Sequence, residues 1–211
     1  MEYRTIAKPC EASVIEKRSE FIAQYFPISS ADEFAEKLEM IRGKHHKARH
    51  HVWAYRLRSD GTSRYSDDGE PQGTGGVPVL GVLQKAELTD VCCIVTRYFG
   101  GVLLGASGLT RAYSQAAAEA LQIAEIQHFC EAEHLRLQMD YGMYGKVSYL
   151  LPTFETLEIS SDFGENVTLE FDVKSELFDA LNTRLTDLFN GTPALERLET
   201  HFADFSKVVQ P

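Results

Sequence analysis

The chain has 211 residues, of which 44% are hydrophobic and 25% are charged, and this ordinary composition excludes a wholly disordered protein. No apolar run is long enough to cross a bilayer, and the first residues do not form a signal peptide, so we expect a cytoplasmic protein with no membrane partner. The net charge of −10 is uneven, because residues 131–211 hold six basic and 15 acidic residues, whereas residues 1–130 hold 15 and 16.

The first 123 residues predict alternating strands and helices. Residues 13–28 are rich in β-branched and aromatic side chains and predict two short strands or a hairpin. Phe34, Leu38 and Ile41 recur at spacings of four and three, which predicts an amphipathic helix over 31–42 that ends at Gly43. The elements expected next are a strand at 51–57, a long loop at 59–76, a helix at 77–83, a strand at 91–99, a glycine-rich turn at 100–108 and a helix at 109–123.

A linker is expected at residues 124–132, after which the pattern restarts. The elements predicted there are a strand at 132–139, a helix at 142–151, strands at 154–161 and 166–173, a helix at 176–189 and a strand at 194–202. This β-α-β-β-α-β order is that of a ferredoxin-like domain. The fold class is therefore predicted as α+β, with one domain in residues 1–130 and a ferredoxin-like domain in residues 131–211.

The four cysteines form no Cys-x-x-Cys pair and are expected to be free thiols in a reducing compartment. Cys92 and Cys93 are adjacent within the predicted strand at 91–99. Because neighbouring side chains on a strand point to opposite faces, we expect one of them in the core and the other against a helix.

A basic stripe lies in the first domain, where residues 42–64 hold seven Lys and Arg, four His and one acid, Asp60. Such a stripe on a nearly neutral domain can contact phosphate, although a solvated face is the alternative.

Residues 49–55, RHHVWAY, lie within this stripe and predict a strand. His50 faces one side of the strand, and three rings face the other: His51, Trp53 and Tyr55. The rings could stack on bases while Arg49 binds phosphate. A metal site is the weaker alternative, because the four neighbouring histidines lack the spacing and the carboxylate of a zinc-binding helix. No metal and no cofactor are therefore predicted, and a purely structural role stays open.

Residues 66–76, SDDGEPQGTGG, form a loop with three carboxylates, which are Asp67, Asp68 and Glu70. The carboxylates could bind a cation, although the spacing of a calcium loop is absent, or they could act as a general acid or base. A third use is to order the loop by pairing with Arg64 or Arg97. Thr74 and Gly75 lead into the predicted helix, whose first N–H groups could bind an anion.

Residues 96–101, TRYFGG, place Arg97 in an apolar strand, where its charge needs a carboxylate or a phosphate as partner. Gly100 and Gly101 allow a sharp turn and the close approach of another backbone or of a ligand. Residues 105–108 precede a predicted helix and form a second candidate anion site.

These motifs give one set of candidate nucleic-acid- or anion-binding residues. Its members are Arg49, His50, His51, Trp53, Tyr55, Arg64, Thr74, Gly75, Arg97, Tyr98, Gly100, Gly101 and Arg111. The candidate site or loop-ordering carboxylates are Asp67, Asp68 and Glu70.

Taken in this order, the motifs at residues 49–55, 66–76 and 94–105 resemble those of the IMPACT (YigZ-like) family. The resemblance implies a βαβ-rich first domain similar to domain four of elongation factor G, and a ferredoxin-like second domain that also resembles a domain of that factor. It also implies a link to translational control, in which eukaryotic relatives oppose a kinase that senses amino-acid starvation. Those relatives use an added N-terminal domain of the RWD type, which we expect this chain to lack, so the kinase role is not carried over.

Three functions follow as hypotheses. The first is a non-enzymatic RNA- or ribosome-associated factor in the regulation of translation, although the acidic second domain argues against simple nucleic-acid binding. The second is a protein–protein adaptor. The third is an enzyme on a small anionic substrate, with His50 or His51 as acid or base, Asp67, Asp68 or Glu70 as its partner and Arg97 holding the anion. Some bacterial relatives have been labelled proline dipeptidases, but the sequence shows no dinuclear metal-ligand set.

Overall fold

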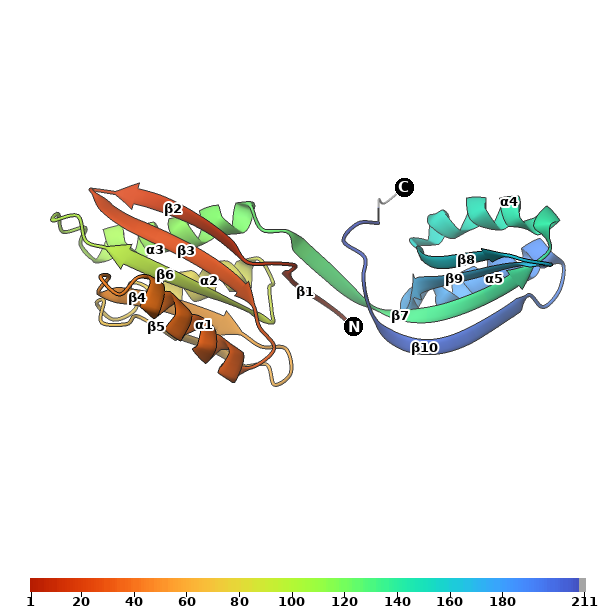
Figure 1. The fold of residues 1–211 in the computed structure, drawn as a ribbon, viewed down its shortest axis with the longest axis horizontal. Coiled ribbons are helices and arrows are strands. Elements are labelled where there is room, and N and C mark those ends of the chain that lie inside the picture. The colour runs from red at the N-terminus through yellow and green to blue at the C-terminus, as the bar shows by residue number, and fades with distance from the viewer. Residues whose placement is uncertain (209–211) are drawn as a thin grey trace. The chain divides into compact units, whose positions relative to one another are not determined.

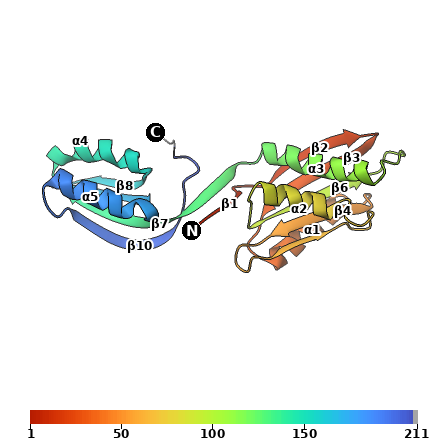
Figure 2. The same ribbon diagram turned by 180° about the vertical axis from the view of Figure 1, so that it is seen from behind.

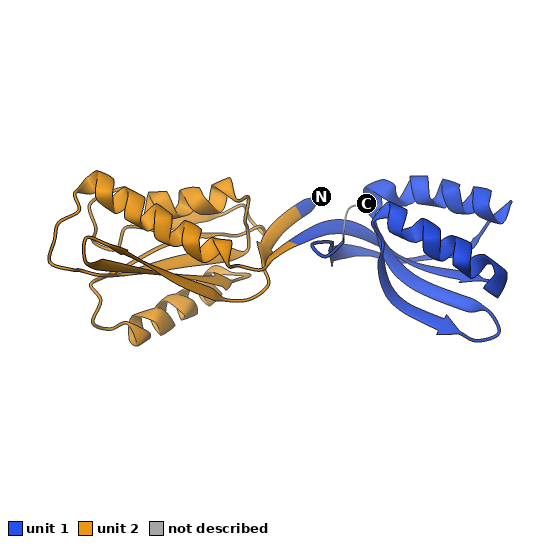
Figure 3. Cartoon of the chain, turned by 90° about the horizontal axis from the view of Figure 1, so that it is seen from above, with its two compact units in different colours: residues 1–2, 128–211 blue, residues 3–127 orange. Residues whose placement is uncertain are grey.

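The computed structural model describes residues 1–208 and divides into two compact units. One unit consists of residues 3–127, and the other of residues 128–211 together with residues 1 and 2 (Figure 3). No helix within residues 1–208 is long and apolar enough to cross a membrane.

The first unit is built on a five-stranded antiparallel sheet. Its strands, in spatial order, are β2 (Cys10–Glu16), β3 (Ser19–Pro27), β6 (Val91–Tyr98), β4 (His50–Arg56) and β5 (Ser63–Ser66). β6 lies in the middle of the sheet, and β3 and β4 both pair with it antiparallel, so they run parallel to one another. The helix between β3 and β4 therefore makes the crossover of a βαβ unit.

Helices cover both faces of this sheet (Figures 1 and 2). One face packs against α2 (Gly76–Lys85) and α3 (Ala106–Gln122), and the other face packs against α1 (Ala31–Lys44). Because both faces are covered, β6 is buried from Val91 to Arg97, and its first five residues are all apolar. Cys93 belongs to the core under α2 and α3, and Cys92 to the core under α1. The two free thiols point to opposite faces as expected, but both are core residues and both face a helix.

The second unit contains the predicted β-α-β-β-α-β order. Its elements are β7 (Ile126–Met139), α4 (Tyr141–Leu150), β8 (Leu157–Phe163), β9 (Val167–Lys174), α5 (Phe178–Phe189) and β10 (Ala194–Asp204), with short 3-10 helices at Leu151–Phe154 and Ser175–Leu177. The strands are antiparallel in the spatial order β10, β7, β9, β8, which is the arrangement of a ferredoxin-like domain. Apolar side chains at alternate positions of β7 and β9 face the two helices.

Several sequence-based boundaries were wrong. The linker expected at 124–132 is largely strand, because β7 runs unbroken from Ile126, and the polar residues of its first half hide its alternation. The loop expected at 59–76 contains β5, whose side chains are too polar and exposed to show a strand pattern. β1 (Glu2–Ile6), which pairs with β7, was not predicted at all. α3 begins at Ala106, so Gly108 lies inside the helix rather than before it.

Gly100 fits where a larger residue cannot, because a Cβ atom at this position would lie 2.0 Å from the backbone carbon and oxygen of Arg18. Here the chain leaving β6 passes against the β2–β3 turn, and the Gly100 N–H donates to Ser19 Oγ at 3.1 Å. The expected close approach of another backbone at Gly100 is thus confirmed.

Gly100→Ala is expected to lower the free energy of unfolding by about 1–3 kcal/mol, since the added methyl group must push two backbones apart. Gly43→Ala is the matched control, because Gly43 lies in α1 with open space around it and should gain about 0.5–1 kcal/mol from better helix propensity. Urea unfolding of the two variants measures both effects. Equal stability of the Gly100 variant and the parent would show that the contact is not tight.

Candidate functional site

The three sequence motifs meet at the end of the sheet where β6 finishes. His50, the first residue of β4, lies opposite Arg97 of β6, and Glu20 of β3 lies opposite Tyr98. The β2–β3 turn contacts the segment after β6 at Gly100, and the loop of residues 66–76 covers the start of β4 through contacts with His50 and His51. Segments far apart in the sequence therefore form one surface here.

Asp67 caps the start of α2. Its carboxylate accepts backbone N–H groups from Gly73 at 2.8 Å, from Gly75 at 2.9 Å and from Gly76 at 2.8 Å. Burial alone would raise the pKa of Asp67, but these three hydrogen bonds outweigh it and lower the pKa below its ordinary value. The N–H groups at Gly75 and Gly76, expected to bind an external anion, therefore bind the protein's own carboxylate, and Thr74 donates to the Pro71 carbonyl at 2.7 Å.

Asp68 joins the loop to β4 and α1. Its carboxylate accepts the His51 backbone N–H at 2.6 Å and pairs with the Arg42 guanidinium at 3.2 Å. Its backbone adopts a left-handed conformation with φ of 44°, which turns its carbonyl oxygen towards His50 Nδ1 at 2.8 Å. The His50 ring is thus oriented by a carbonyl group and not by the Asp68 carboxylate.

Glu70 is the buried centre of the loop. Its Oε1 accepts hydrogen bonds from Arg97 and from the Tyr113 hydroxyl of α3, both at 2.7 Å. Arg97 is buried too, and its guanidinium lies 5.4 Å from the ring centre of Phe21 and 5.5 Å from that of Phe99. Burial, and then the charge of Glu70, raise the pKa of Tyr113, so its hydroxyl stays a donor. Pairing of Arg97 with a loop carboxylate was one of the sequence interpretations, and it is confirmed.

All three carboxylates of the loop are therefore used internally, which is the third of the alternatives read from the sequence. The geometry does not support the His50–Asp68–Arg97 enzyme hypothesis, because Arg97 pairs with Glu70 and the Asp68 carboxylate pairs with Arg42. A general acid or base needs its partner within hydrogen-bonding reach, and the His50 ring contacts only the Asp68 carbonyl among these loop groups.

The buried histidines of the first unit have structural partners. His51 Nδ1 lies 3.1 Å from Thr96 Oγ1, and His45 Nδ1 lies 3.0 Å from the Tyr98 hydroxyl. Burial lowers the pKa of both rings, which favours their neutral form.

Four of the candidate residues take no part in these contacts. Tyr55 is buried, and with the half-buried Trp53 it packs on Phe34 of α1, so these rings belong to the α1 core. Arg64 lies opposite Tyr55 on the edge strand β5, towards the other end of β4. Arg111 lies on the exposed side of α3, along a groove shared with α2.

Six exposed basic or large apolar residues lie on the segments at this end, and we call them the β6-end surface. Its members are Lys17, Arg18, Lys47, Arg49, Phe99 and Leu103. Phe99 is 55% exposed and Leu103 is 83% exposed, which is unusual for such large apolar side chains. α3 follows at once, and no side chain caps its first turn. Of these six residues, the sequence prediction included only Arg49; the exposed Phe99 could have been found from the two glycines that follow it.

Comparison with known proteins agrees with this two-unit architecture. The model of the Impact N-terminal domain matches residues 17–121, and that of a domain of unknown function (DUF1949) matches residues 137–192. A solved structure titled "Crystal structure of an hypothetical protein" covers 94% of this chain with a TM-score of 0.59 and 28% identity. The molecule is thus of the class that joins an Impact-type domain to a second α+β domain.

Relatives define the family more closely. IMPACT family member YvyE of Bacillus subtilis (strain 168) is 33% identical over 203 residues, which are 96% of this chain and 94% of that protein. IMPACT family member YigZ of Escherichia coli (strain K12) is 30% identical over 87% of this chain and 91% of its own length. Protein IMPACT of Rattus norvegicus is 28% identical over 44% of this chain, and the match covers 31% of that protein. The chain belongs to the IMPACT family, as its motifs indicate.

Asp67→Asn is expected to lower the free energy of unfolding by about 1–2 kcal/mol at neutral pH, since the amide cannot accept all three hydrogen bonds of the cap. The folded-state pKa of Asp67 lies below its ordinary value. The ionised carboxylate therefore stabilises the fold at pH values above the ordinary pKa, and this stabilisation is lost as the pH falls through the lowered pKa. Urea unfolding across the acidic range should show a flatter pH dependence for Asp67→Asn. The exposed Glu36→Gln serves as control, and identical pH profiles for parent and Asp67→Asn would contradict the assignment.

Glu70→Gln is expected to lower the free energy of unfolding by about 3–5 kcal/mol, because it leaves the buried Arg97 charge without a carboxylate. Glu119→Gln, at an exposed position of α3, should change stability by no more than about 0.5 kcal/mol. Thermal and urea unfolding compare the two substitutions. A loss for Glu70→Gln as small as that of the control would mean that the pair does not hold the loop.

Proposed function

We propose that this protein is a non-enzymatic RNA- or ribosome-associated factor in the regulation of translation, and that it binds through the β6-end surface. Membership of the IMPACT family supports a link to the regulation of translation. The contact itself is inferred from the chemistry of the surface.

The observation that carries this proposal is that four exposed basic residues and an exposed aromatic ring lie on the segments that meet at the end of β6. Arg18 lies against Gly100, which is the residue after Phe99. Arg49 precedes His50, and His50 lies opposite Arg97 of β6. Basic side chains contact phosphates, and an exposed aromatic ring stacks on unpaired bases. The carboxylates of the loop at residues 66–76 point inward to Arg97, to Arg42 and to the start of α2, so their charges are compensated. Glu16 and Glu20 also lie at the β2–β3 turn, where they reduce the net positive charge. RNA is favoured over duplex DNA, because its loops and ends present unstacked bases.

The acidic second unit fits this proposal as a limit on nonspecific binding. The whole chain carries a net charge of −10, so a general attraction to nucleic acid is weak, and binding depends on the local surface. A ribosome also offers basic proteins, which the acidic unit could contact.

The variant Arg18→Ala/Arg49→Ala tests the phosphate contacts by ribosome co-sedimentation and by filter binding of ribosomal RNA over a range of salt. Loss of two contacts should weaken binding and reduce the slope of log affinity against log salt by about 1.5. Phe99→Ala should cost about 1–3 kcal/mol of binding free energy and leave the salt slope unchanged.

Lys85→Ala is the matched control, because Lys85 is exposed at the end of α2, towards the end of the sheet where β6 begins, and its loss should change neither quantity. Failure of the parent protein to bind RNA or ribosomes at low salt would exclude the proposal. Equal weakening by Lys85→Ala and by the double variant would show nonspecific attraction instead of a defined surface.

A protein–protein adaptor is the second candidate, and the exposure of Leu103 next to Val102 favours it, since apolar loop tips often mark protein contacts. Recovery of one stoichiometric protein partner after ribonuclease treatment, lost with Leu103→Ser and kept with Arg18→Ala/Arg49→Ala, would favour this function over RNA binding.

A further inference from the structure

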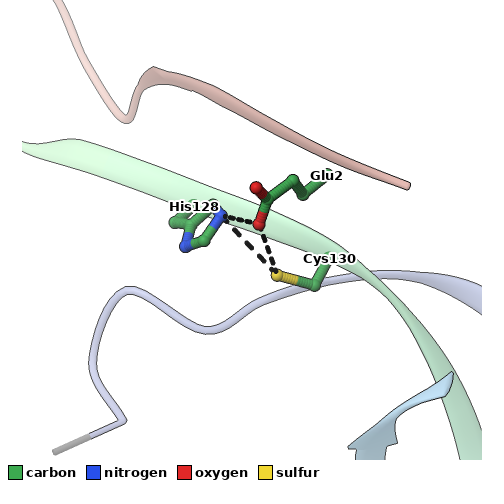
Figure 4. Close-up of side chains that lie close together, drawn as sticks. All are labelled: Glu2, His128 and Cys130. Atoms are coloured by element: carbon green, nitrogen blue, oxygen red, sulfur yellow. Dashed lines mark hydrogen bonds and ion pairs between the residues drawn. The ribbon is translucent and has the colours of Figure 1, made fainter. Parts of the chain in front are cut away.

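Three metal-ligating side chains converge in the second unit. Glu2 lies at the start of β1, and His128 and Cys130 lie two residues apart on β7, so they point to the same face of that strand (Figure 4). Glu2 Oε2 lies 2.8 Å from His128 Nε2, and Cys130 Sγ lies 3.7 Å from the same nitrogen. Cys130 Sγ lies 4.0 Å from Glu2 Oε2. This is the only such group of His, Cys, Asp and Glu found within residues 1–208.

These separations are close to those around a tetrahedral ion. With bonds of about 2.0–2.2 Å to nitrogen and oxygen and about 2.3 Å to sulfur, the ligand atoms of a tetrahedral zinc ion lie about 3.3–3.6 Å apart. Each pair of atoms at Glu2, His128 and Cys130 is within about 0.6 Å of that range. Small rotations of the exposed Glu2 side chain close the difference without moving a strand.

The arrangement does not fit a catalytic relay of cysteine, histidine and glutamate. In such a relay the imidazole contacts the nucleophile with one nitrogen and the carboxylate with the other. Here the carboxylate and the thiol both approach the same nitrogen, Nε2 of His128. Three ligand atoms that point at one place are instead what a metal ion requires.

Neighbouring residues position these ligands, and an adjacent hollow gives a metal ion access to them. The His128 backbone N–H donates to Asp204 Oδ1 at 3.1 Å, which fixes this part of β7 against the end of β10. A hollow of about 330 Å³ opens beside Glu2 and Cys130, and its wall includes Lys174 and Ser175. The ammonium group of Lys174 is engaged by Glu155, so a carboxylate offsets its repulsion of a cation. The hollow has room for a water molecule at a fourth ligand position.

We propose that Glu2, His128 and Cys130 form a three-ligand site for a thiophilic divalent transition-metal ion, of which Zn²⁺ is the representative. The mixed oxygen, nitrogen and sulfur set suits zinc better than magnesium or calcium, which prefer oxygen alone. The bound ion joins β1 to β7 and stabilises the folded state. This site stands apart from the proposed RNA-binding function, because its ligands belong to a different unit from the β6-end surface.

Metal binding at this site releases a proton. The Cys130 thiol must lose its proton to bind the ion as a thiolate. The reaction is Cys130–SH plus M²⁺ giving Cys130–S–M⁺ plus H⁺, with no oxidant or reductant involved. The affinity therefore falls as the pH decreases.

Titration of the reduced, metal-free full chain with Co²⁺ tests the site, on a protein without an N-terminal tag because Glu2 is a ligand. We expect a thiolate-to-cobalt charge-transfer band in the near ultraviolet that saturates at one ion per chain, and its displacement by Zn²⁺. About one proton per ion should be released near neutral pH, measured by calorimetry in two buffers.

Cys130→Ser should abolish the band. Loss of a residue that only hydrogen-bonds to a metal ligand typically weakens metal binding by roughly 10–100-fold. Glu2→Gln and His128→Ala remove ligands, so each should weaken Zn²⁺ binding by more than that. Glu2→Gln changes an exposed side chain and should leave the folded state intact, so it tests the site even if Cys130→Ser unfolds. Zn²⁺ should raise the Tm of the parent and not that of Glu2→Gln.

Cys10→Ser is the matched control, because the Cys10 thiol donates to the Ala120 carbonyl and is not part of the cluster. It should leave the band and the affinity unchanged. Absence of a thiolate band in the parent, its persistence in Cys130→Ser, or unchanged Zn²⁺ affinity in Glu2→Gln would each overturn the proposal.

Discussion

The buried ion pair of Glu70 and Arg97 is the contact on which the arrangement of the first domain depends. Arg97 lies in the central strand, where an unpaired charge is costly, and the loop of residues 66–76 supplies the carboxylate that compensates it. The Tyr113 hydroxyl binds the same oxygen and links α3 to the pair. With Glu70 fixed, the loop is short enough that Asp67 reaches the start of α2 and Asp68 reaches β4. One polar contact thus sets the positions of a strand, a loop and two helices.

This arrangement decides which chemistry is exposed. The loop looks acidic in the sequence, yet each of its carboxylates points inward to a guanidinium group or to backbone N–H groups. The exposed groups at the end of β6 include cations and large apolar side chains, with Glu16 and Glu20 partly exposed beside them. This mixture of exposed cations and apolar side chains is the basis of the RNA-binding proposal.

In the second domain, too, the buried carboxylates are paired with polar or basic side chains of the same domain. The buried Glu133 accepts from Ser175 and Thr200 and pairs with Arg197, and the buried Asp172 lies between the rings of His134 and His201. Most of its remaining carboxylates are exposed and solvated, so the net charge of this domain reflects its surface and not its core. Its β7 strand also brings His128 and Cys130 beside Glu2, the start of a strand that pairs with it.

Local pattern determined most of the fold. Periodic apolar residues such as Phe34, Leu38 and Ile41 predicted α1. The β-α-β-β-α-β order of the second domain followed from alternating side chains in its strands and helical spacing in its helices, because side-chain period is set by backbone geometry. The polar strands β1 and β5 were missed, since their pairing comes from backbone hydrogen bonds that leave little trace in side-chain type. The motifs also placed His50, Asp68, Glu70 and Arg97 in one site. Only the tertiary structure decided that the three carboxylates serve the protein itself, and that Glu2 lies beside His128, 126 residues away in the sequence. Such contacts depend on strand pairing and burial, which no local spacing encodes.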